Sequence, residues 1–211
     1  MSDAAVGEVL DGLWRFEAIH PDWTEDQGGE EGWEASVAWW ALATEHGLAL
    51  VDPLVEDWPA LDGLLDAHGG CAGIVRTCYW HQRSVAEAAA RYRAPVWAGV
   101  EASGSSPHPP DHTVRDGDEL FGALRVIDVE RADEIALWLP AQRALLFGDA
   151  MLRRGEELRV CPPSWTQPEG GYERLVELLR GLRGMPVEHV LVSHGQFVAR
   201  DGAGALERAT G

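Results

Sequence analysis

The chain has 211 residues, of which 45% are hydrophobic and 25% are charged, the proportions of an ordinary folded globular protein. Its formal net charge of −18 repels phosphate backbones and anionic lipid headgroups, so neither nucleic acid nor a membrane surface is an expected partner. The length fits one domain over residues 1–211, because α/β folds of this size commonly remain undivided.

The cysteine pattern and the start of the chain both indicate a reducing compartment. Cys71, Cys78 and Cys161 match no zinc-knuckle spacing. The first twelve residues are acidic and lack the apolar segment of a signal peptide. We therefore expect a cytoplasmic protein.

The first half of the chain predicts strands that alternate with helices. Asp57 is placed to cap a helix whose first turn holds Pro59. Strand, helix and strand in succession indicate parallel pairing. The expected strands are 13–18, 35–43, 48–51, 72–77 and 95–98, and the expected helices are 58–67 and 83–92.

The second half predicts closely spaced strands, a helix and a last buried strand. Residues 140–143 form a short hairpin connection between two of these strands. Together with the first half, this pattern predicts an α/β (α+β) fold in which mixed sheets carry helices on their outer faces. The expected strands are 124–129, 135–139, 144–147 and 190–193, and the expected helix is 172–182.

Polar residues follow three of the expected strands directly. Thr77 to Arg83 follows one strand, Asp149 follows another, and His194 follows the last. Each alone is typical of a turn or a helix cap. Because folds usually place function where buried strands run into loops, the three together indicate a site.

The order of these features resembles the metallo-β-lactamase superfamily, which includes the hydroxyacylglutathione hydrolases. The resemblance extends from Val9 to Val198 and implies a four-layer αββα sandwich that hydrolyses an ester, thioester, lactam or phosphoester. The similar segments are 77–83, which corresponds to the family's His-x-His-x-Asp-His loop, 116–120 (its "dGdel" turn), 148–149 (its bridging aspartate) and 193–195 (its last histidine).

The chain departs from that family at most of the implied metal ligands. Only Asp149 and His194 are retained, and a one-residue shift places His81 at the second histidine position. Aligned without gaps, Cys78, Trp80, Gln82 and Arg83 stand where the family has His, His, Asp and His, and the next histidine falls at Glu130.

Two of these departures argue against a metal ion. Trp80 offers no ligand atom, and Arg83 is a permanent cation that repels a dication. We therefore expect no metal cofactor, and we hypothesise that an ion pair between Arg83 and Asp149 takes the place of zinc.

The first hypothesis is a hydrolase-derived, metal-free domain that binds or hydrolyses a small molecule. Trp23, Trp33 and Trp165 lie in loops that are placed to make the rim of its pocket apolar. The catalytic candidates are Asp149, His194, Arg83 and His81, and the ligand-binding candidates are Cys78, Trp80 and Glu130.

Two other hypotheses remain open. One is an active hydrolase that uses zinc or another divalent metal held by unusual ligands: Cys78, Glu130, Asp149 and His194, with or without His81. The other is a non-catalytic interaction protein. Glu130 is also typical of a solvated turn, because charged residues surround it at Asp128, Arg131, Asp133 and Glu134.

Overall fold

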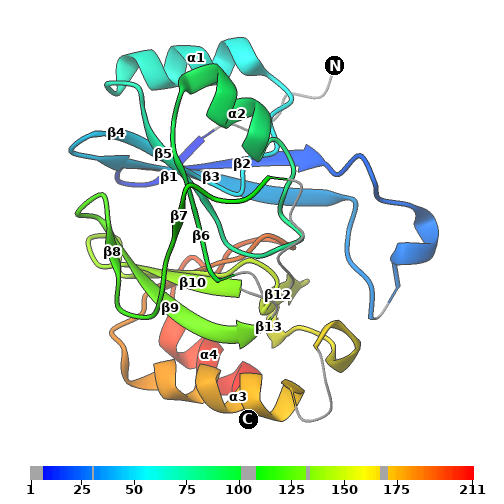
Figure 1. Ribbon diagram of the computed structural model, residues 1–211. Helices are drawn as coiled ribbons and strands as arrows, with labels where there is room; N and C mark the ends of the chain where they lie inside the picture. The colour runs from blue at the N-terminus through cyan, green and yellow to red at the C-terminus, as the bar shows by residue number, and fades with distance from the viewer. Residues whose placement is uncertain (1–6, 30, 101–107, 132–133, 167–170) are drawn as a thin grey trace.

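The computed structural model describes residues 7–29, 31–100, 108–131, 134–166 and 171–211. Two sheets pack face to face, and a pair of helices covers the outer face of each sheet (Figure 1). These four layers confirm the predicted αββα sandwich. No helix in the described ranges is both long enough and apolar enough to cross a bilayer.

The first sheet holds seven strands in sequence order. The pairs from β1 to β4 are antiparallel, and those from β4 to β7 are parallel. The strands are β1 (Gly7–Leu10), β2 (Leu13–Ile19), β3 (Ser36–Thr44), β4 (Gly47–Val51), β5 (Cys71–Arg76), β6 (Val96–Ala98) and β7 (His112–Thr113).

The second sheet has the strand order β14-β11-β10-β9-β8, in which only the β11–β14 pair is parallel. A separate hairpin, β12–β13, lies beside it. The strands are β8 (Glu119–Leu120), β9 (Leu124–Arg131), β10 (Glu134–Leu139), β11 (Ala144–Leu146), β12 (Met151–Arg154), β13 (Glu157–Val160) and β14 (His189–Leu191).

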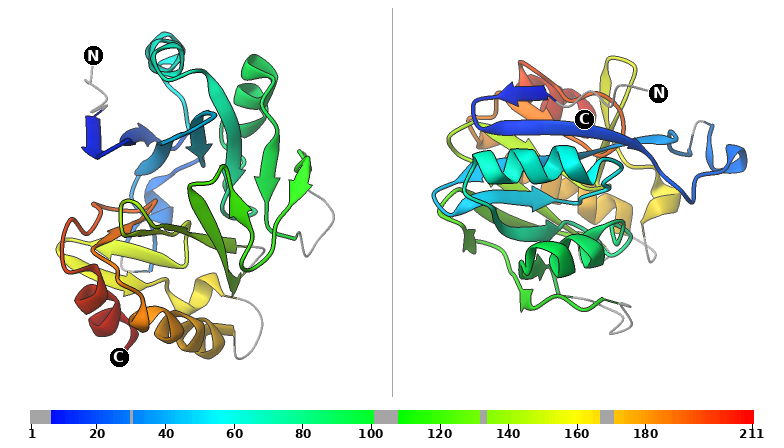
Figure 2. Two further views of the ribbon diagram at one scale, coloured as in Figure 1. Left: turned by 90° about the vertical axis from the view of Figure 1, so that its left-hand side faces the viewer. Right: turned by 90° about the horizontal axis from the view of Figure 1, so that it is seen from above.

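Helices α1 and α2 lie across the first sheet, and α3 and α4 cover the second (Figure 2). Helix α1 begins as predicted, since the Asp57 carboxylate accepts a hydrogen bond from the Ala60 N–H at 2.9 Å. The helices are α1 (Trp58–Ala67), α2 (Val85–Tyr92), α3 (Gly171–Gly181) and α4 (Gly202–Thr210), with short 3₁₀ turns at Glu25–Gln27, Pro163–Trp165 and Leu182–Gly184.

The alternation of side chains along strand β3 divides the core. Trp40 packs between the two sheets, whereas its neighbour Trp39 packs beneath the helices of the first sheet. Burial of both faces explains why β3 is apolar from Val37 to Ala43. Hairpin β12–β13 and helix α4 were not expected from the sequence.

Hydrogen bonds join the two sheets where two of their strands end, and this junction positions the site. The Ala38 N–H donates to the Ser193 carbonyl at 2.8 Å, and the Ile135 N–H donates to the Thr77 carbonyl at 2.8 Å. Each bond ties the end of a strand in one sheet to the other sheet. The polar residues that follow these strands are thereby brought together.

Candidate metal centre

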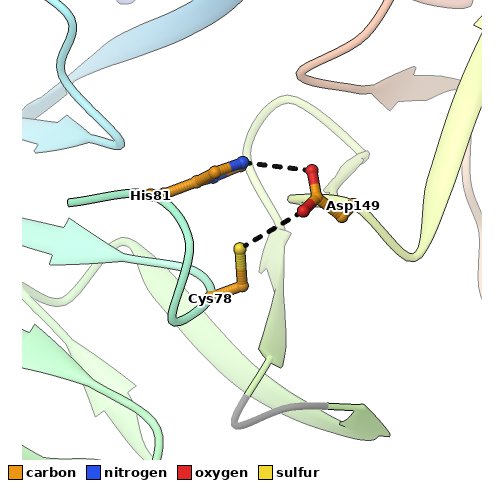
Figure 3. A group of neighbouring side chains, drawn as sticks. All are labelled: Cys78, His81 and Asp149. Atoms are coloured by element: carbon orange, nitrogen blue, oxygen red, sulfur yellow. Dashed lines mark hydrogen bonds and ion pairs between the residues drawn. The ribbon is translucent and has the colours of Figure 1, made fainter. Parts of the chain in front are cut away.

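Three buried side chains from both sheets converge on the carboxylate of Asp149. The Nε2 atoms of His81 and His194 each lie 3.1 Å from Oδ1 of Asp149. The thiol of Cys78 lies 3.6 Å from Oδ2 of the same residue. Figure 3 shows His81 and Cys78 approaching Asp149 from one side. All four residues are buried.

Three of these side chains form a compact set of donors. The sulfur of Cys78, a ring nitrogen of His81 and an oxygen of Asp149 all lie within 4.8 Å of one another. In the described part of the chain this is the one group of three or more such donors. Thiolate, imidazole and carboxylate are the ligand types of zinc and similar divalent ions.

Asp52 fixes the orientation of His81 from behind. Its Oδ2 lies 2.8 Å from Nδ1 of His81, while its Oδ1 accepts the Thr77 N–H at 2.7 Å. Nδ1 of an imidazole held this way carries a proton, and Nε2 faces the cluster. Burial opposes ionisation of Asp52, but the charges of His81 and Arg83 and the hydrogen bonds lower its pKa.

Arg83 lies beside this pair and does not contact Asp149 as hypothesised. Its Nη1 donates to the carbonyls of Ala38 at 3.2 Å and of Asp52 at 3.1 Å. Its Nη2 lies 3.1 Å from Nε2 of His81. Both Arg83 (φ 35°) and Asp52 (φ 51°) adopt the left-handed conformation. The hypothesis of an Arg83–Asp149 ion pair is therefore wrong, because main-chain carbonyls hold the guanidinium instead.

The cation next to Asp149 is Arg131, at 3.9 Å from Oδ2. Arg131 is itself paired with Glu134 at 2.5 Å, and both are buried. Oε1 of Glu134 accepts the N–H groups of Asp149 and Ala150 at 2.8 and 2.7 Å. The expectation of a solvated turn here is wrong for Arg131 and Glu134, because these buried partners satisfy their charges.

The protonation states follow from burial and from the opposing charges. Burial raises the pKa of the Cys78 thiol to about 12. Burial also opposes ionisation of Asp149, but His81 and His194 hold the pKa of that carboxyl well below its usual value. For His81, burial and Arg83 act against protonation, yet Cys78, Asp52 and Asp149 raise its pKa well above 6.5. Burial lowers the pKa of His194.

Aromatic side chains from two loops surround His194. The ring centroids of Trp33 and Trp165 lie 5.6 and 5.7 Å from that of His194. The indole N–H of Trp165 donates to the Glu31 carbonyl at 3.0 Å, and that of Trp23 donates to the Trp33 carbonyl at 3.0 Å. The Trp165 bond holds the segment that follows β13 against the segment between β2 and β3, and the Trp23 bond closes the latter segment on itself.

Of the remaining candidates, Trp80 does not join the cluster. Trp80 is 56% exposed and packs edge-on against Tyr79 at 5.3 Å. Glu130 belongs to strand β9, and its side chain is outside the part that the structure describes. Asp52 and the Arg131–Glu134 pair were not expected from the sequence. The available signal was the position of Asp52 itself, a polar residue directly after the buried strand 48–51.

Comparisons with known proteins identify the fold. No family model matches the chain, and neither does any curated protein. The solved structure of DIM-1 metallo-β-lactamase is 15% identical, with a TM-score of 0.72 over 97% of this chain and 94% of that one. FIM-1 from Pseudomonas aeruginosa in its mono-zinc form is 14% identical, with a TM-score of 0.70 over 98% and 94%.

A metallo-β-lactamase family protein from Thermus thermophilus is also similar, at 18% identity and a TM-score of 0.67 over 96% of this chain and 78% of that chain. The chain therefore has the metallo-β-lactamase fold. This confirms the resemblance that the motifs indicated.

The expectation of no metal cofactor is wrong. Two findings overturn it. The fold is similar to that of metallo-β-lactamases, one of which is a mono-zinc form, and Cys78, His81 and Asp149 offer a set of metal donors. The donor set fits a metal ion chemically, because it supplies sulfur, nitrogen and oxygen ligands at one point. The ungapped alignment failed because it left His81 outside the ligand positions.

Proposed function

We propose that the protein is a metal-dependent hydrolase of a small molecule. The ion would be held by Cys78, His81, Asp149 and His194. The observation that carries this proposal is the convergence of His81 and His194, through Nε2, on one oxygen of Asp149 at 3.1 Å.

The contacts of His81 favour a cation at this point. Its Nε2 faces the donor-only Nη2 of Arg83 and the acceptor-only Oδ1 of Asp149, each at 3.1 Å. With a proton on Nε2, His81 can donate a hydrogen bond to Asp149 but repels the N–H of Arg83. With a lone pair on Nε2, His81 can accept a hydrogen bond from Arg83 but repels the carboxylate of Asp149. A metal ion would accept the nitrogen lone pair and attract the carboxylate, so it relieves the conflict on the Asp149 side.

The surrounding residues support the donors in the way that metal centres require. Asp52 holds the ring of His81, and Glu134 holds the backbone that carries Asp149. Arg131 compensates the buried charge of Glu134. When bound, a divalent ion supplies an activated water and polarises the bond to be cleaved.

The reaction class follows from this chemistry and from the aromatic side chains around the site. A metal-activated water suits ester, thioester, lactam or phosphoester bonds. Trp33 and Trp165 beside His194 favour a substrate with an apolar portion.

Metal analysis of protein purified without chelator tests the proposal. We expect about one equivalent of zinc, iron or manganese. The variants His81→Ala and His194→Ala should lose most of that metal, whereas His46→Ala, at an exposed surface position, should keep it. A panel of ester, thioester, lactam and phosphoester substrates then identifies the bond that is cleaved. Absence of both metal and turnover, even after loading with each ion, would contradict the proposal.

A further inference from the structure

Arg83 is a cation in the site that has no carboxylate partner within 4.0 Å among the described residues. Its three polar contacts are the carbonyls of Ala38 and Asp52 and the imidazole nitrogen of His81. None of these is a carboxylate. By contrast, the neighbouring buried Arg131 is paired directly with Glu134.

This arrangement is costly, which indicates that it serves a purpose. A partly buried cation loses hydration, and the Nε of Arg83 is buried without a hydrogen-bond partner in the described structure. The residue also adopts a left-handed backbone conformation, with φ of 35°. Conformations of this kind persist where the surroundings enforce them, and they cluster at functional sites.

We infer that Arg83 binds an oxyanion on the substrate, either a carboxylate or a phosphate. The inference rests on the proposed hydrolase function and narrows its substrates to small anions. A guanidinium presents parallel N–H donors that match both oxyanions. A local cation is also needed because the net charge of −18 repels anions from the protein as a whole.

The contacts of Arg83 show how its guanidinium would become free to bind an anion. Nε2 of His81 cannot both bind a metal ion and accept a hydrogen bond from Nη2 of Arg83. Metal loading therefore frees Nη2, while Nη1 remains anchored to the carbonyls of Ala38 and Asp52. The anchored guanidinium then has a free nitrogen beside the metal donors. An anion held there would lie next to the reacting bond.

The electrostatic effect of Arg83 on its neighbours agrees with this position. Burial lowers the pKa of His20, and the Arg83 charge lowers it further. The same charge opposes protonation of His194, after the larger effect of burial. Arg83 therefore acts as a positive charge toward both histidines.

Anion binding measured by calorimetry tests the inference. Sodium acetate and inorganic phosphate are titrated separately into metal-free and zinc-loaded protein. We expect the wild type to bind one of the two, which identifies the oxyanion. Arg83→Met should weaken that binding by about tenfold to a hundredfold, because hydrogen bonds to charged groups are among the strong ones. Arg83→Lys should lose less, since it keeps the charge.

Arg143→Met is the matched control. Arg143 also has a left-handed backbone (φ 50°) and donates to a main-chain carbonyl, that of Pro186, but it pairs with Glu188 at the surface. This variant should bind the anion like the wild type. Thermal melts check that each variant is folded, and Arg83→Lys compared with Arg143→Lys serves if Arg83→Met does not fold.

The outcomes separate this inference from the proposed function. Equal anion binding by wild type and Arg83→Met, or no binding of either anion by the wild type, overturns the role of Arg83 even if metal is present. If the protein holds no metal but binds an anion in a way that depends on Arg83, only the proposed hydrolase function is overturned. In turnover assays, Arg83→Met should raise KM for an ester with a free carboxylate more than for its uncharged methyl-ester counterpart.

Discussion

Asp52 and Glu134 are both buried carboxylates behind the candidate metal centre, yet they differ in what they hold. Asp52 is bonded to a titratable side chain, the imidazole of His81, at 2.8 Å. Glu134 is bonded to the backbone of Asp149 and Ala150 and to a permanent cation, Arg131. The first carboxylate therefore orients a donor atom, whereas the second shapes the loop that carries one.

The same difference appears in their protonation. Burial disfavours the charged form of each, but His81 and Arg83 lower the pKa of Asp52 overall. For Glu134 the effect of burial is larger than that of the Arg131 charge, so the pKa of Glu134 is raised. We expect Asp52 to contribute mainly to metal binding and Glu134 mainly to stability, and the variants below test that division.

Removal of Glu134 should have the largest effect. Glu134→Ala leaves the Arg131 cation buried without its carboxylate, which typically costs about 3–5 kcal/mol of stability. The free energy of unfolding in urea measures this. Glu157→Ala is the control, because its ion pair with Arg159 is exposed and contributes little. A loss below about 1 kcal/mol for Glu134→Ala would show that the pair is not structural.

Removal of the Asp52 charge should affect metal binding more than folding. Asp52→Asn weakens the hold on Nδ1 of His81, and changes of this kind typically reduce metal affinity by about 10- to 100-fold. Competition with a chelator measures the affinity. Asp57→Asn is a suitable control, since Asp57 caps helix α1 at the surface. Unchanged affinity in Asp52→Asn would remove Asp52 from the centre.

Gly148 lies where the two carboxylate systems meet. A Cβ at this position would collide with the Thr77 hydroxyl, which is bonded to Asp52, and would lie 3.2 Å from Oε1 of Glu134. Gly148→Ala should therefore destabilise the protein by about 1–3 kcal/mol. Gly63→Ala, in α1 with open space around it, should be neutral or slightly stabilising. Equal thermal stability of the two variants would contradict this packing.

The pH dependence of stability should show the smallest effects, with opposite signs. The pKa of Asp52 is below 3.8 in the folded state, so its stabilising contribution is present above pH 3.8 and is lost as the pH falls through the folded value. The pKa of Glu134 is above 4.5, so stability falls as the pH rises from 4.5 through its folded value.

Urea unfolding of metal-free protein from acid to neutral pH measures both contributions. Asp52→Asn should flatten the acid limb, and Glu134→Gln should flatten the decline above pH 4.5. If both variants follow the wild-type profile, neither carboxylate titrates differently in the folded and unfolded states.

The sequence allowed most of the elements and much of the site to be predicted, for identifiable reasons. Helix α1 has a capping aspartate and a proline in its first turn, which are local signals. Asp149 and His194 each follow a buried strand closely. The partner of Arg83 was predicted wrongly, because its contacts to Ala38 and Asp52 depend on how strand β3 packs against the segments that follow β4 and β5.

By itself, the sequence determined the layered fold, the start of helix α1 and the strand ends at which polar residues gather. Periodicity, capping and turn chemistry act between residues that are close along the chain. Only the tertiary structure decided that His81 meets Asp149, 68 residues away, and that Glu134 is buried with Arg131. Charge compensation depends on distance in space. From sequence alone, a segment of charged residues is therefore expected to be solvated, and only the structure shows which opposite charges are close enough to allow its burial.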